Sequence, residues 1–334
     1  MTYNDLISIE NLFQAYAEFK KGKKKRLDLQ VFERNLEDNL FDLYLYLKNK
    51  TYRHGNYEEF YVNDPKRRHI HKASVEDRIV HHLLYKYLYE VFDKTFIYDS
   101  YSCRLNKGTH KGVIRLEKFA RIVSGNYTRD CLALKLDIKK FFASVDHEIL
   151  FELLKKKITN KDILWLLGNI IESFNSNAGE GKGIPLGNLT SQIFANIYMN
   201  ELDQFVKHKL RVKYYLRYAD DFIILNSDRG LLDRYTSIPV FLEENLKLEL
   251  HPSKIIMRKL SWGIDFLGYI VLSRYILPRT KTKKRMIRKM ILKLDENTKG
   301  RISKNSLYQT IQSYLGYLSH ASAYKLSEGL RNLV

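Results

Sequence analysis

Residues 216–225, Leu216-Arg217-Tyr218-Ala219-Asp220-Asp221-Phe222-Ile223-Ile224-Leu225, place two adjacent carboxylates between apolar arms. Neighbouring side chains of a strand point to opposite faces, so a strand-turn-strand is the natural way to expose both carboxylates at a tip. A hard divalent cation such as Mg2+ takes one or two protein carboxylates and keeps its other positions for water and substrate phosphates. The stretch therefore predicts a β-hairpin that presents charge to a metal ion. Taken alone, it is equally compatible with a solvated acidic turn.

A second acidic segment lies upstream, at residues 134–142, where an alternating apolar strand ends in Asp137 and two aromatic residues follow. One carboxylate at a strand end plus a distant pair on a hairpin is the arrangement that two-metal phosphoryl transfer needs, with the ions about 3.5–4 Å apart. We expect Asp137 and Asp220 to bridge both ions and Asp221 to support them. Together the two segments predict the palm of a nucleic-acid polymerase.

Composition agrees with a nucleic-acid partner. The 334 residues include 57 Lys and Arg against 38 Asp and Glu, a formal net charge of +19. Such an excess suits a phosphate backbone bound in a salt-dependent way. The 24 tyrosines, scattered among basic residues, suit stacking on bases, although many will be ordinary packing residues. The length suits a compact body with an appended small domain.

Cysteine usage and hydropathy limit the cellular setting. Cys103 and Cys131 form neither a disulfide framework nor a zinc-binding spacing, which indicates a reducing cytoplasm. The N-terminus shows no secretory signal, and no apolar run approaches the ~20 residues of a membrane span, so we expect a cytoplasmic protein without a membrane partner. Several histidines show no convincing metal-ligand pattern, and we interpret them as structural or phosphate-facing: His69, His71, His81, His82 and His110.

Apolar spacing gives a coarse order of elements. We expect helices over residues 1–50, with a basic loop at 20–26 that is either solvated or contacts phosphate. We then expect strands at 57–62 and 64–71, a helix at 74–89, a polar loop at 102–110 that opens a helix, and a capped helix at 147–157. A Gly- and Pro-punctuated loop at 181–192 should lead into a helix at 193–209, followed by a helix at 241–250, a hairpin at 263–270 and a basic helical region from 281.

The order of these motifs resembles that of reverse transcriptases over residues 55–275. The resemblance rests on the strand from Pro65 to Ile70, the loop from Tyr101, Asp137, the loop at Gly187, the Tyr218–Asp221 hairpin, Lys254 and residues 266–269. It implies an α+β right-hand polymerase with fingers, a ferredoxin-like antiparallel palm sheet and a short helical thumb. The implied domains are an N-terminal helical extension (1–54), fingers and palm (55–275, with finger elements also at 147–180) and a thumb (276–334).

Within this superfamily of group II intron-like bacterial enzymes, the loop at 184–192 is similar to that of diversity-generating retroelements. Leu186 stands at a position where Gln is usual, and Ser191-Gln192 stands where Ser-Pro is usual. The subgroup copies a template-repeat RNA into adenine-mutagenised cDNA for retrohoming into a variable gene region, with a small basic pentameric accessory protein. One alternative is a retron-like or defence-associated reverse transcriptase. The other is a non-catalytic RNA-binding protein, and the presence of all three carboxylates argues against this second alternative.

The resemblance also implies residue roles. Asp137, Asp220, Asp221 and the backbone carbonyl of Ile138 would hold two Mg2+ ions, for which Mn2+ can substitute, and Lys254 would act as a general acid. The deoxynucleotide would contact Lys66, Arg68, Phe142, Leu186 and Gly187, with Phe142 excluding ribonucleotides. Leu186 offers shape in place of hydrogen bonds, which predicts low fidelity unless it only packs the loop. Template RNA, primer and cDNA would contact Arg78, Arg104, Ser191, Gln192, Tyr218, Phe266, Leu267, Gly268, Lys284 and Arg285.

Overall fold

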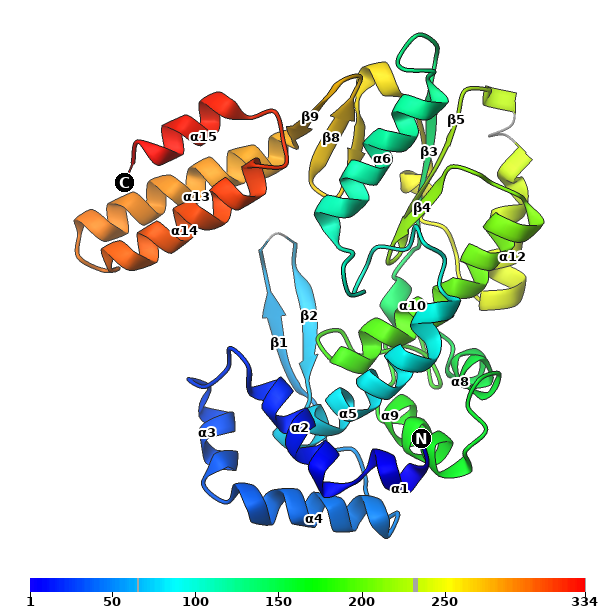
Figure 1. Ribbon diagram of the computed structural model, residues 1–334, viewed down its shortest axis with the longest axis vertical. Helices are drawn as coiled ribbons and strands as arrows, with labels where there is room; N and C mark the ends of the chain where they lie inside the picture. Colours follow the sequence, from blue (N-terminus) through cyan, green and yellow to red (C-terminus); the bar gives the residue numbers. More distant parts are fainter. Residues whose placement is uncertain (65, 231–233, 334) are drawn as a thin grey trace. The chain divides into compact units, whose positions relative to one another are not determined.

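The computed structural model describes residues 1–64, 66–230 and 234–333 (Figure 1). Pro65, expected to open the basic strand, lies outside the described residues. The chain divides into two compact units, each assembled from three segments. One, here called the helical unit, comprises Met1–Tyr98, Ile138–Arg211 and Ser237–His251. The other, the sheet unit, comprises Asp99–Asp137, Val212–Thr236 and Pro252–Val334.

The helical unit begins with four helices, as the apolar spacing of residues 1–50 predicts. They are α1 (Tyr3–Leu6), α2 (Ile9–Lys20), α3 (Leu27–Glu33) and α4 (Leu36–Lys48). The Ser8 hydroxyl caps α2 by accepting a hydrogen bond from the backbone N–H of Asn11. Helix α2 packs against α4 and against the long helix α5 (Val75–Phe92) through buried residues such as Leu12 and Phe19.

The remaining helices of this unit include α10 and several that pack against it. They are η1 (Asp93–Thr95), α7 (Phe141–Ser144), α8 (His147–Lys155), α9 (Lys161–Glu172), α10 (Leu189–Gln204), η2 (Phe205–Lys209) and α12 (Ser237–Leu246). Helix α10 is buried on nearly all sides and contacts α5, α8 and α12. It begins at Leu189 rather than at residue 193 as expected, because Asn188 already has the extended backbone of an N-cap. Helix α12 likewise begins four residues earlier than expected.

A two-stranded antiparallel hairpin, β1 (Glu58–Val62) and β2 (Arg68–Lys72), belongs to the helical unit. Its register pairs Glu58 with Lys72 and Val62 with Arg68. Every residue of β1 is exposed. Both strands and the basic character of the second were expected from the sequence.

The sheet unit is built on a four-stranded antiparallel sheet with strand order β4-β5-β3-β6. The strands are β3 (Leu132–Asp137), β4 (Tyr215–Tyr218), β5 (Asp221–Asn226) and β6 (Ile256–Lys259), and the 3-10 turns are η3 (Arg234–Thr236), η4 (Pro252–Lys254) and η5 (Leu260–Trp262). This strand order, with helices after β3 and after β5 in the sequence, is the ferredoxin-like βαββαβ topology. Helix α6 (Thr109–Val123) packs against β4 and β5 through Val113, Leu116 and Ala120.

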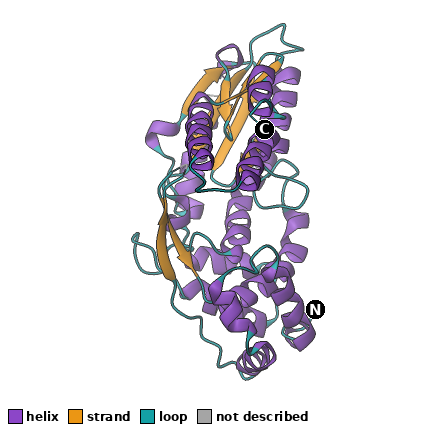
Figure 2. Cartoon of the chain, turned by 90° about the vertical axis from the view of Figure 1, so that its left-hand side faces the viewer, coloured by secondary structure: helices purple, strands orange, loops and turns teal. Residues whose placement is uncertain are grey.

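The rest of the sheet unit is a small sheet followed by three helices, shown as orange strands and purple helices in Figure 2. The strands are β7 (Ile264–Phe266), β8 (Tyr269–Leu272) and β9 (Tyr275–Pro278), and the helices are α13 (Thr280–Thr298), α14 (Lys304–Leu318) and α15 (Tyr324–Arg331). Met286, Met290 and Ile311 form the helices' own core. None of the described helices combines the length and apolarity needed to cross a membrane.

Candidate active site

Three carboxylates meet at one edge of the four-stranded sheet. Strand β3 ends at Asp137 and β5 begins at Asp221, and these two residues are direct partners in the antiparallel register. Directly opposed residues of antiparallel strands have Cα atoms roughly 4.5–5.5 Å apart. Asp220 lies in the two-residue turn after Tyr218, which itself pairs with Asp221. The predicted hairpin and the predicted strand end are therefore confirmed, and the register brings the acidic residues together.

The turn that carries Asp220 is supported by a buried arginine. Ala219 has a left-handed backbone with φ of 53°, which is strained for a residue other than glycine. Arg217 is 0% exposed, and its Nη1 donates to the carbonyl oxygen of Ala219 at 3.0 Å while its Nη2 donates to the Ser100 hydroxyl at 3.2 Å. The acidic motif alone indicates no role for Arg217. The signal for it is a charged residue inside an otherwise apolar strand.

Two lysines accompany the carboxylates. The Lys254 Nζ lies 2.6 Å from Asp137 Oδ1, and the Lys135 Nζ lies 3.1 Å from Asp221 Oδ2. Lys135 also donates to the backbone carbonyl of Asp265 at 3.0 Å, which fixes its position. Lys254 was a predicted site residue, whereas Lys135 was missed. Because it precedes Asp137 by two residues on one strand, the alternation of side chains places both on the same face.

The environment of Asp221 suits a divalent cation. Burial raises the pKa of Asp221 to about 6, Lys135 acts in the opposite direction, and the carboxylates of Asp137 and Asp220 raise it further. The Oδ1 atom of Asp221 is buried and has no hydrogen-bond partner within the described part of the chain. A buried acceptor without a partner is costly, and a cation between opposed carboxylates would supply one. These residues therefore fit the metal ions expected from the sequence.

The predicted nucleotide-contacting residues lie on the helical unit. Lys66 and Arg68 are exposed at the tip of the hairpin. At its base, the backbone N–H of His71 donates to the carbonyl oxygen of Leu186 at 3.0 Å. Gly187 has φ of 116°, and a Cβ there would lie 2.8 Å from Ile70 Cγ2, so only glycine fits this close approach. The loop that contains Leu186 and Gly187 therefore packs against strand β2. The contacts of these residues with a nucleotide stay predictions.

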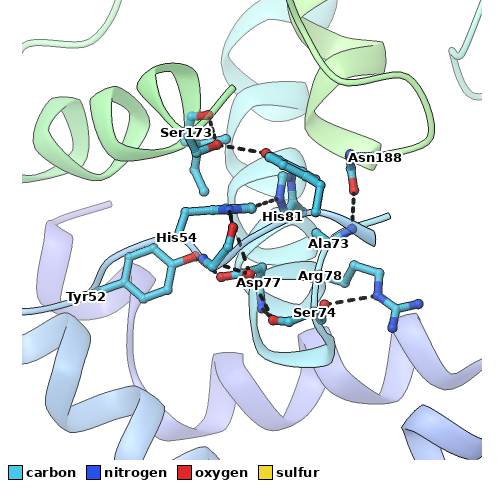
Figure 3. A network of polar contacts seen from close by, with 12 residues as sticks. Tyr52, His54, Ala73, Ser74, Asp77, Arg78, His81, Ser173 and Asn188 are labelled. Atoms are coloured by element: carbon cyan, nitrogen blue, oxygen red, sulfur yellow. Dashed lines mark hydrogen bonds and ion pairs between the residues drawn. The ribbon is translucent and has the colours of Figure 1, made fainter. Parts of the chain in front are cut away.

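Asn188 anchors the same loop. Its Nδ2 donates to the carbonyl oxygen of His71 at 2.7 Å. Its Oδ1 accepts from the backbone N–H of Ala73 at 3.4 Å (Figure 3). The next residue, Ser74, accepts a hydrogen bond from the N–H of Asp77 and so caps α5. Sequence patterns indicate no role for Asn188, because its partners lie more than 100 residues away.

A buried polar network continues from this cap (Figure 3). Asp77 accepts hydrogen bonds from the Tyr52 hydroxyl at 2.6 Å and from the Gly55 N–H at 3.1 Å, and His54 Nε2 lies 3.0 Å from His81 Nε2. Burial lowers the pKa of His81 well below its usual value. The expectation that His81 is structural therefore agrees with its surroundings.

Other predicted contacts of template and primer fall into buried and exposed groups. Ser191 is 1% exposed within α10, and the Phe266 ring is buried in the core of the sheet unit, so both side chains pack inside the protein and their contacts with nucleic acid stay predictions. The Arg78 guanidinium pairs with Asp28 at 2.6 Å. Lys284 and Arg285 are exposed on α13, whereas the following residues are partly buried: Arg104, Gln192, Tyr218, Leu267 and Gly268.

Two further predicted residues follow Asp137. Ile138 is buried and forms an isolated antiparallel bridge with Leu250. The Phe142 carbonyl oxygen accepts a hydrogen bond from the N–H of Ile184 at 2.8 Å, and its ring lies 5.5 Å from that of Phe141. Their roles as a metal ligand and as a sugar gate stay predictions.

Comparison with known families decides the general identity. Residues 62–271 match the family described as reverse transcriptase (RNA-dependent DNA polymerase). The chain belongs to this family. The match includes strand β2, the loop at Gly187 and all three carboxylates, so the reverse transcriptase resemblance is confirmed at the level of the family.

Similar curated proteins include the putative COX1/OXI3 intron 2 protein of Saccharomyces cerevisiae, 23% identical over 279 residues, which cover 65% of this chain and 31% of that protein. Protein YkfC of Escherichia coli is 24% identical over 244 residues, which cover 60% of this chain and 63% of that protein. The chain thus spans less than two thirds of either relative. This reverse transcriptase family member is therefore only distantly similar to both proteins.

Similar solved structures include telomerases. Apo telomerase from Candida tropicalis, truncated from its C-terminal domain, has a TM-score of 0.52 and 13% identity, covering 72% of this chain and 59% of that one. Telomerase from Candida albicans in complex with a fragment of telomeric RNA has a TM-score of 0.50 and 11% identity, covering 81% and 56%. At such identities the likeness concerns the fold. The expected α+β right-hand polymerase fold of this reverse transcriptase is confirmed.

Proposed function

We propose that this protein is an RNA-directed DNA polymerase that extends a primer on template RNA with deoxynucleoside triphosphates. The observation that carries the proposal is the direct pairing of Asp137 with Asp221, with Asp220 in the adjoining turn. Family membership supports the same reaction. The net charge of +19 suits RNA and cDNA as partners.

The three carboxylates would hold two Mg2+ ions, or Mn2+ in their place, with the Ile138 carbonyl as a further ligand. Bound Mg2+ would lower the pKa of the primer 3′-hydroxyl and neutralise charge on the triphosphate. Lys254, 40% exposed and 2.6 Å from Asp137, would donate a proton to the leaving pyrophosphate. Lys66 and Arg68 would grip the triphosphate, for which a guanidinium is suited by its two parallel donors.

Primer extension tests the reaction. The purified chain should extend a labelled DNA primer on an RNA template when Mg2+ and all four deoxynucleotides are present, and ribonucleotides should be poor substrates. Asp137→Asn should abolish extension without changing the circular dichroism spectrum. An inactive wild-type chain that still binds RNA would instead favour the non-catalytic RNA-binding alternative.

We further propose that the enzyme serves a diversity-generating retroelement, copying a template-repeat RNA into adenine-mutagenised cDNA together with a small basic pentameric accessory protein in the cytoplasm. Leu186 and Ser191-Gln192 support this narrower assignment. The flanking DNA tests it. A pair of near-identical repeats that differ mainly at adenines, beside a gene for a small basic protein, is expected. Their absence would favour a retron-like or defence-associated enzyme.

A further inference from the structure

One face of the β1–β2 hairpin carries three side chains of the kinds that bind transition metals. Glu59 and His71 are direct partners in the antiparallel register, and His69 precedes His71 by two residues. Alternation along β2 therefore places both imidazoles on the face that Glu59 shares. One ligand atom from each residue lies within 4.8 Å of the others. Within residues 1–64, 66–230 and 234–333 this is the one group of three such residues.

The distances are close to those of a metal centre. Glu59 Oε2 lies 3.0 Å from His69 Nε2, and Glu59 Oε1 lies 3.7 Å from His71 Nε2. Zinc binds imidazole nitrogens and carboxylate oxygens at about 2.0–2.2 Å, which in a tetrahedron separates two ligand atoms by roughly 3.3–3.5 Å. The observed separations lie on either side of this value. The two distances reach different oxygens of the Glu59 carboxylate, and the three ligand atoms lie within 4.8 Å of one another, so side-chain rotations that move ligand atoms by about 1 Å would bring them to a common ion.

An ordinary carboxylate–imidazole pair explains only part of the arrangement. It accounts for His69, which is at hydrogen-bonding distance from Glu59. The His71 side chain is 13% exposed, and its Nε2 stands beyond hydrogen-bonding distance from the same carboxylate. Its Nδ1 is buried without a hydrogen-bond partner in the described structure. An imidazole desolvated on this scale without partners is costly, and a ligand at Nε2 would offset that cost.

Packing fixes the two rings in place. The His71 ring lies 4.6 Å from the ring of Phe174 and 4.4 Å from that of His69, and the His69 ring stacks on Tyr61 at 4.5 Å. A ligand set held in this way requires little ordering when an ion arrives. By contrast, His110 and His320 stack at 3.7 Å without belonging to a three-residue group among the described residues.

We propose that Glu59, His69 and His71 bind one divalent transition-metal ion of the Zn2+ class. Two imidazoles and one carboxylate favour such an ion over Mg2+, which prefers oxygen ligands alone. Three protein ligands leave a fourth position for water, as in exchangeable zinc sites. The site differs in residues and in chemistry from the carboxylates of the sheet unit.

The ion would join the two strands at the point where the hairpin meets the Leu186 loop. The main chain of His71 donates to the Leu186 carbonyl oxygen at 3.0 Å and accepts from Asn188 Nδ2 at 2.7 Å. A metal that holds the His71 side chain would therefore stiffen the hairpin between its basic tip and this loop. Binding itself depends only on the hairpin and requires no polymerase activity.

Calorimetry on the full chain without nucleic acid tests the site. Metal-free protein in millimolar Mg2+, which saturates the carboxylate cluster, should bind one equivalent of Zn2+, and Co2+ should give visible absorption bands of four-coordinate geometry. Glu59→Gln removes a direct ligand and should weaken Zn2+ binding by more than the roughly 10- to 100-fold that loss of a group behind a ligand causes. Glu58→Gln is the matched control, because this glutamate is exposed on the same strand but on the opposite face.

A second variant, His69→Gln, should weaken binding to a similar extent, with an unchanged circular dichroism spectrum. The double variant His110→Gln/His320→Gln should bind Zn2+ like the wild type. The proposal is overturned if no Zn2+ binds, if Glu59→Gln and His69→Gln both bind as tightly as the wild type, or if stoichiometry falls only in the double variant. Because no primer or nucleotide is present, the result is independent of the proposed polymerase reaction.

Discussion

The carboxylate edge of the four-stranded sheet and the β1–β2 hairpin both present charge, but they are supported differently. Asp137 and Asp221 lie on neighbouring strands of a sheet whose core includes the fully buried Ile223 and Leu225. The hairpin has two strands, one of them exposed along its whole length. An isolated two-stranded hairpin is marginally stable, and the base of this one donates a hydrogen bond to the Leu186 carbonyl oxygen and accepts one from Asn188.

The difference in support suits two different roles, metal binding at the sheet and nucleotide binding at the hairpin. Metal chemistry requires side chains held to a fraction of an ångström, which a multi-stranded sheet provides. Binding of successive nucleotides requires contacts that form and release, which a hairpin attached at one end permits. Substitutions in the sheet should therefore remove the chemical step, whereas substitutions at the base of the hairpin should alter nucleotide binding or selectivity.

Asp220→Asn gives the largest expected effect. Loss of one ligand charge should lower the rate of primer extension about 10²–10³-fold or more, while the Kd for RNA stays unchanged because the basic surface is intact. Extension rates and filter binding measure the two quantities. Asp228→Asn, in an exposed turn beyond the other end of β5, is the control. A variant that extends primers at the wild-type rate would show that the metal assignment is wrong.

Gly187→Ala should damage the base of the hairpin. Its new Cβ would lie 2.8 Å from Ile70 Cγ2 in addition to the strain of φ at 116°. Gly179→Ala is the control, because Gly179 has φ of 127° but nothing lies within 4 Å of its added Cβ. It therefore measures the cost of backbone strain without a steric clash. We expect Gly187→Ala to cost about 1–3 kcal/mol more free energy of unfolding than Gly179→Ala, and to raise KM for deoxynucleotides. Equal losses in urea unfolding would mean that Ile70 moves aside freely.

The helical unit that carries the hairpin should lose stability in mild acid. Burial lowers the pKa of His82 to about 4, helped by the charges of Lys23 and Arg78. An unfolded imidazole titrates near 6.5, so this contribution is complete above about pH 6.5 and is lost as pH falls toward 4. After a discount for partial exposure, we expect about 1–2 kcal/mol.

Urea unfolding between pH 7 and pH 4.5 measures this loss. His82→Gln should flatten the pH dependence, although His81, whose pKa is also lowered, leaves a residual slope. His208→Gln, at an exposed position, should keep the wild-type profile. A His82→Gln profile that follows the wild type would show that this histidine does not contribute.

Leu186→Gln should have the smallest and most specific effect. A polar side chain near the templating pair should lower misincorporation opposite template adenine severalfold, more than opposite the other bases, because hydrogen bonds discriminate better than shape. Sequencing cDNA that both enzymes make on one template measures the error rates. A uniform loss of activity with unchanged adenine errors would mean that Leu186 only packs the loop.

The sequence predicted what short-range patterns encode. Alternation over residues 134–137 and 216–225 located both acidic segments, because the two-residue period of a strand is local. The start of α10 was placed four residues late, because Asn188 caps the helix through its backbone while its side chain binds the hairpin. Thr190 and Ser191 look like loop residues but are buried in the first turn.

Contacts between distant segments were beyond the sequence. Arg217 and Ser100 are 117 residues apart, and Lys135 and Asp265 are 130 apart, so neither hydrogen bond leaves a local signal. The histidines were assigned no metal for a related reason. The register that sets Glu59 opposite His71 depends on the conformation of the loop between the strands, which composition does not determine.

The interleaving of the two units has a consequence for biosynthesis. The chain crosses from one unit to the other after residues 98, 137, 211, 236 and 251. On the ribosome, the helical unit lacks its third segment until residue 251 has emerged, and the palm sheet lacks β6 until residue 259. The contacts that close the palm sheet, such as those of β3 with β5 and β6, therefore form late, between segments made far apart in time. Nascent fragments released before residue 251 contain neither unit complete, which makes them substrates for chaperones and proteases rather than small working domains.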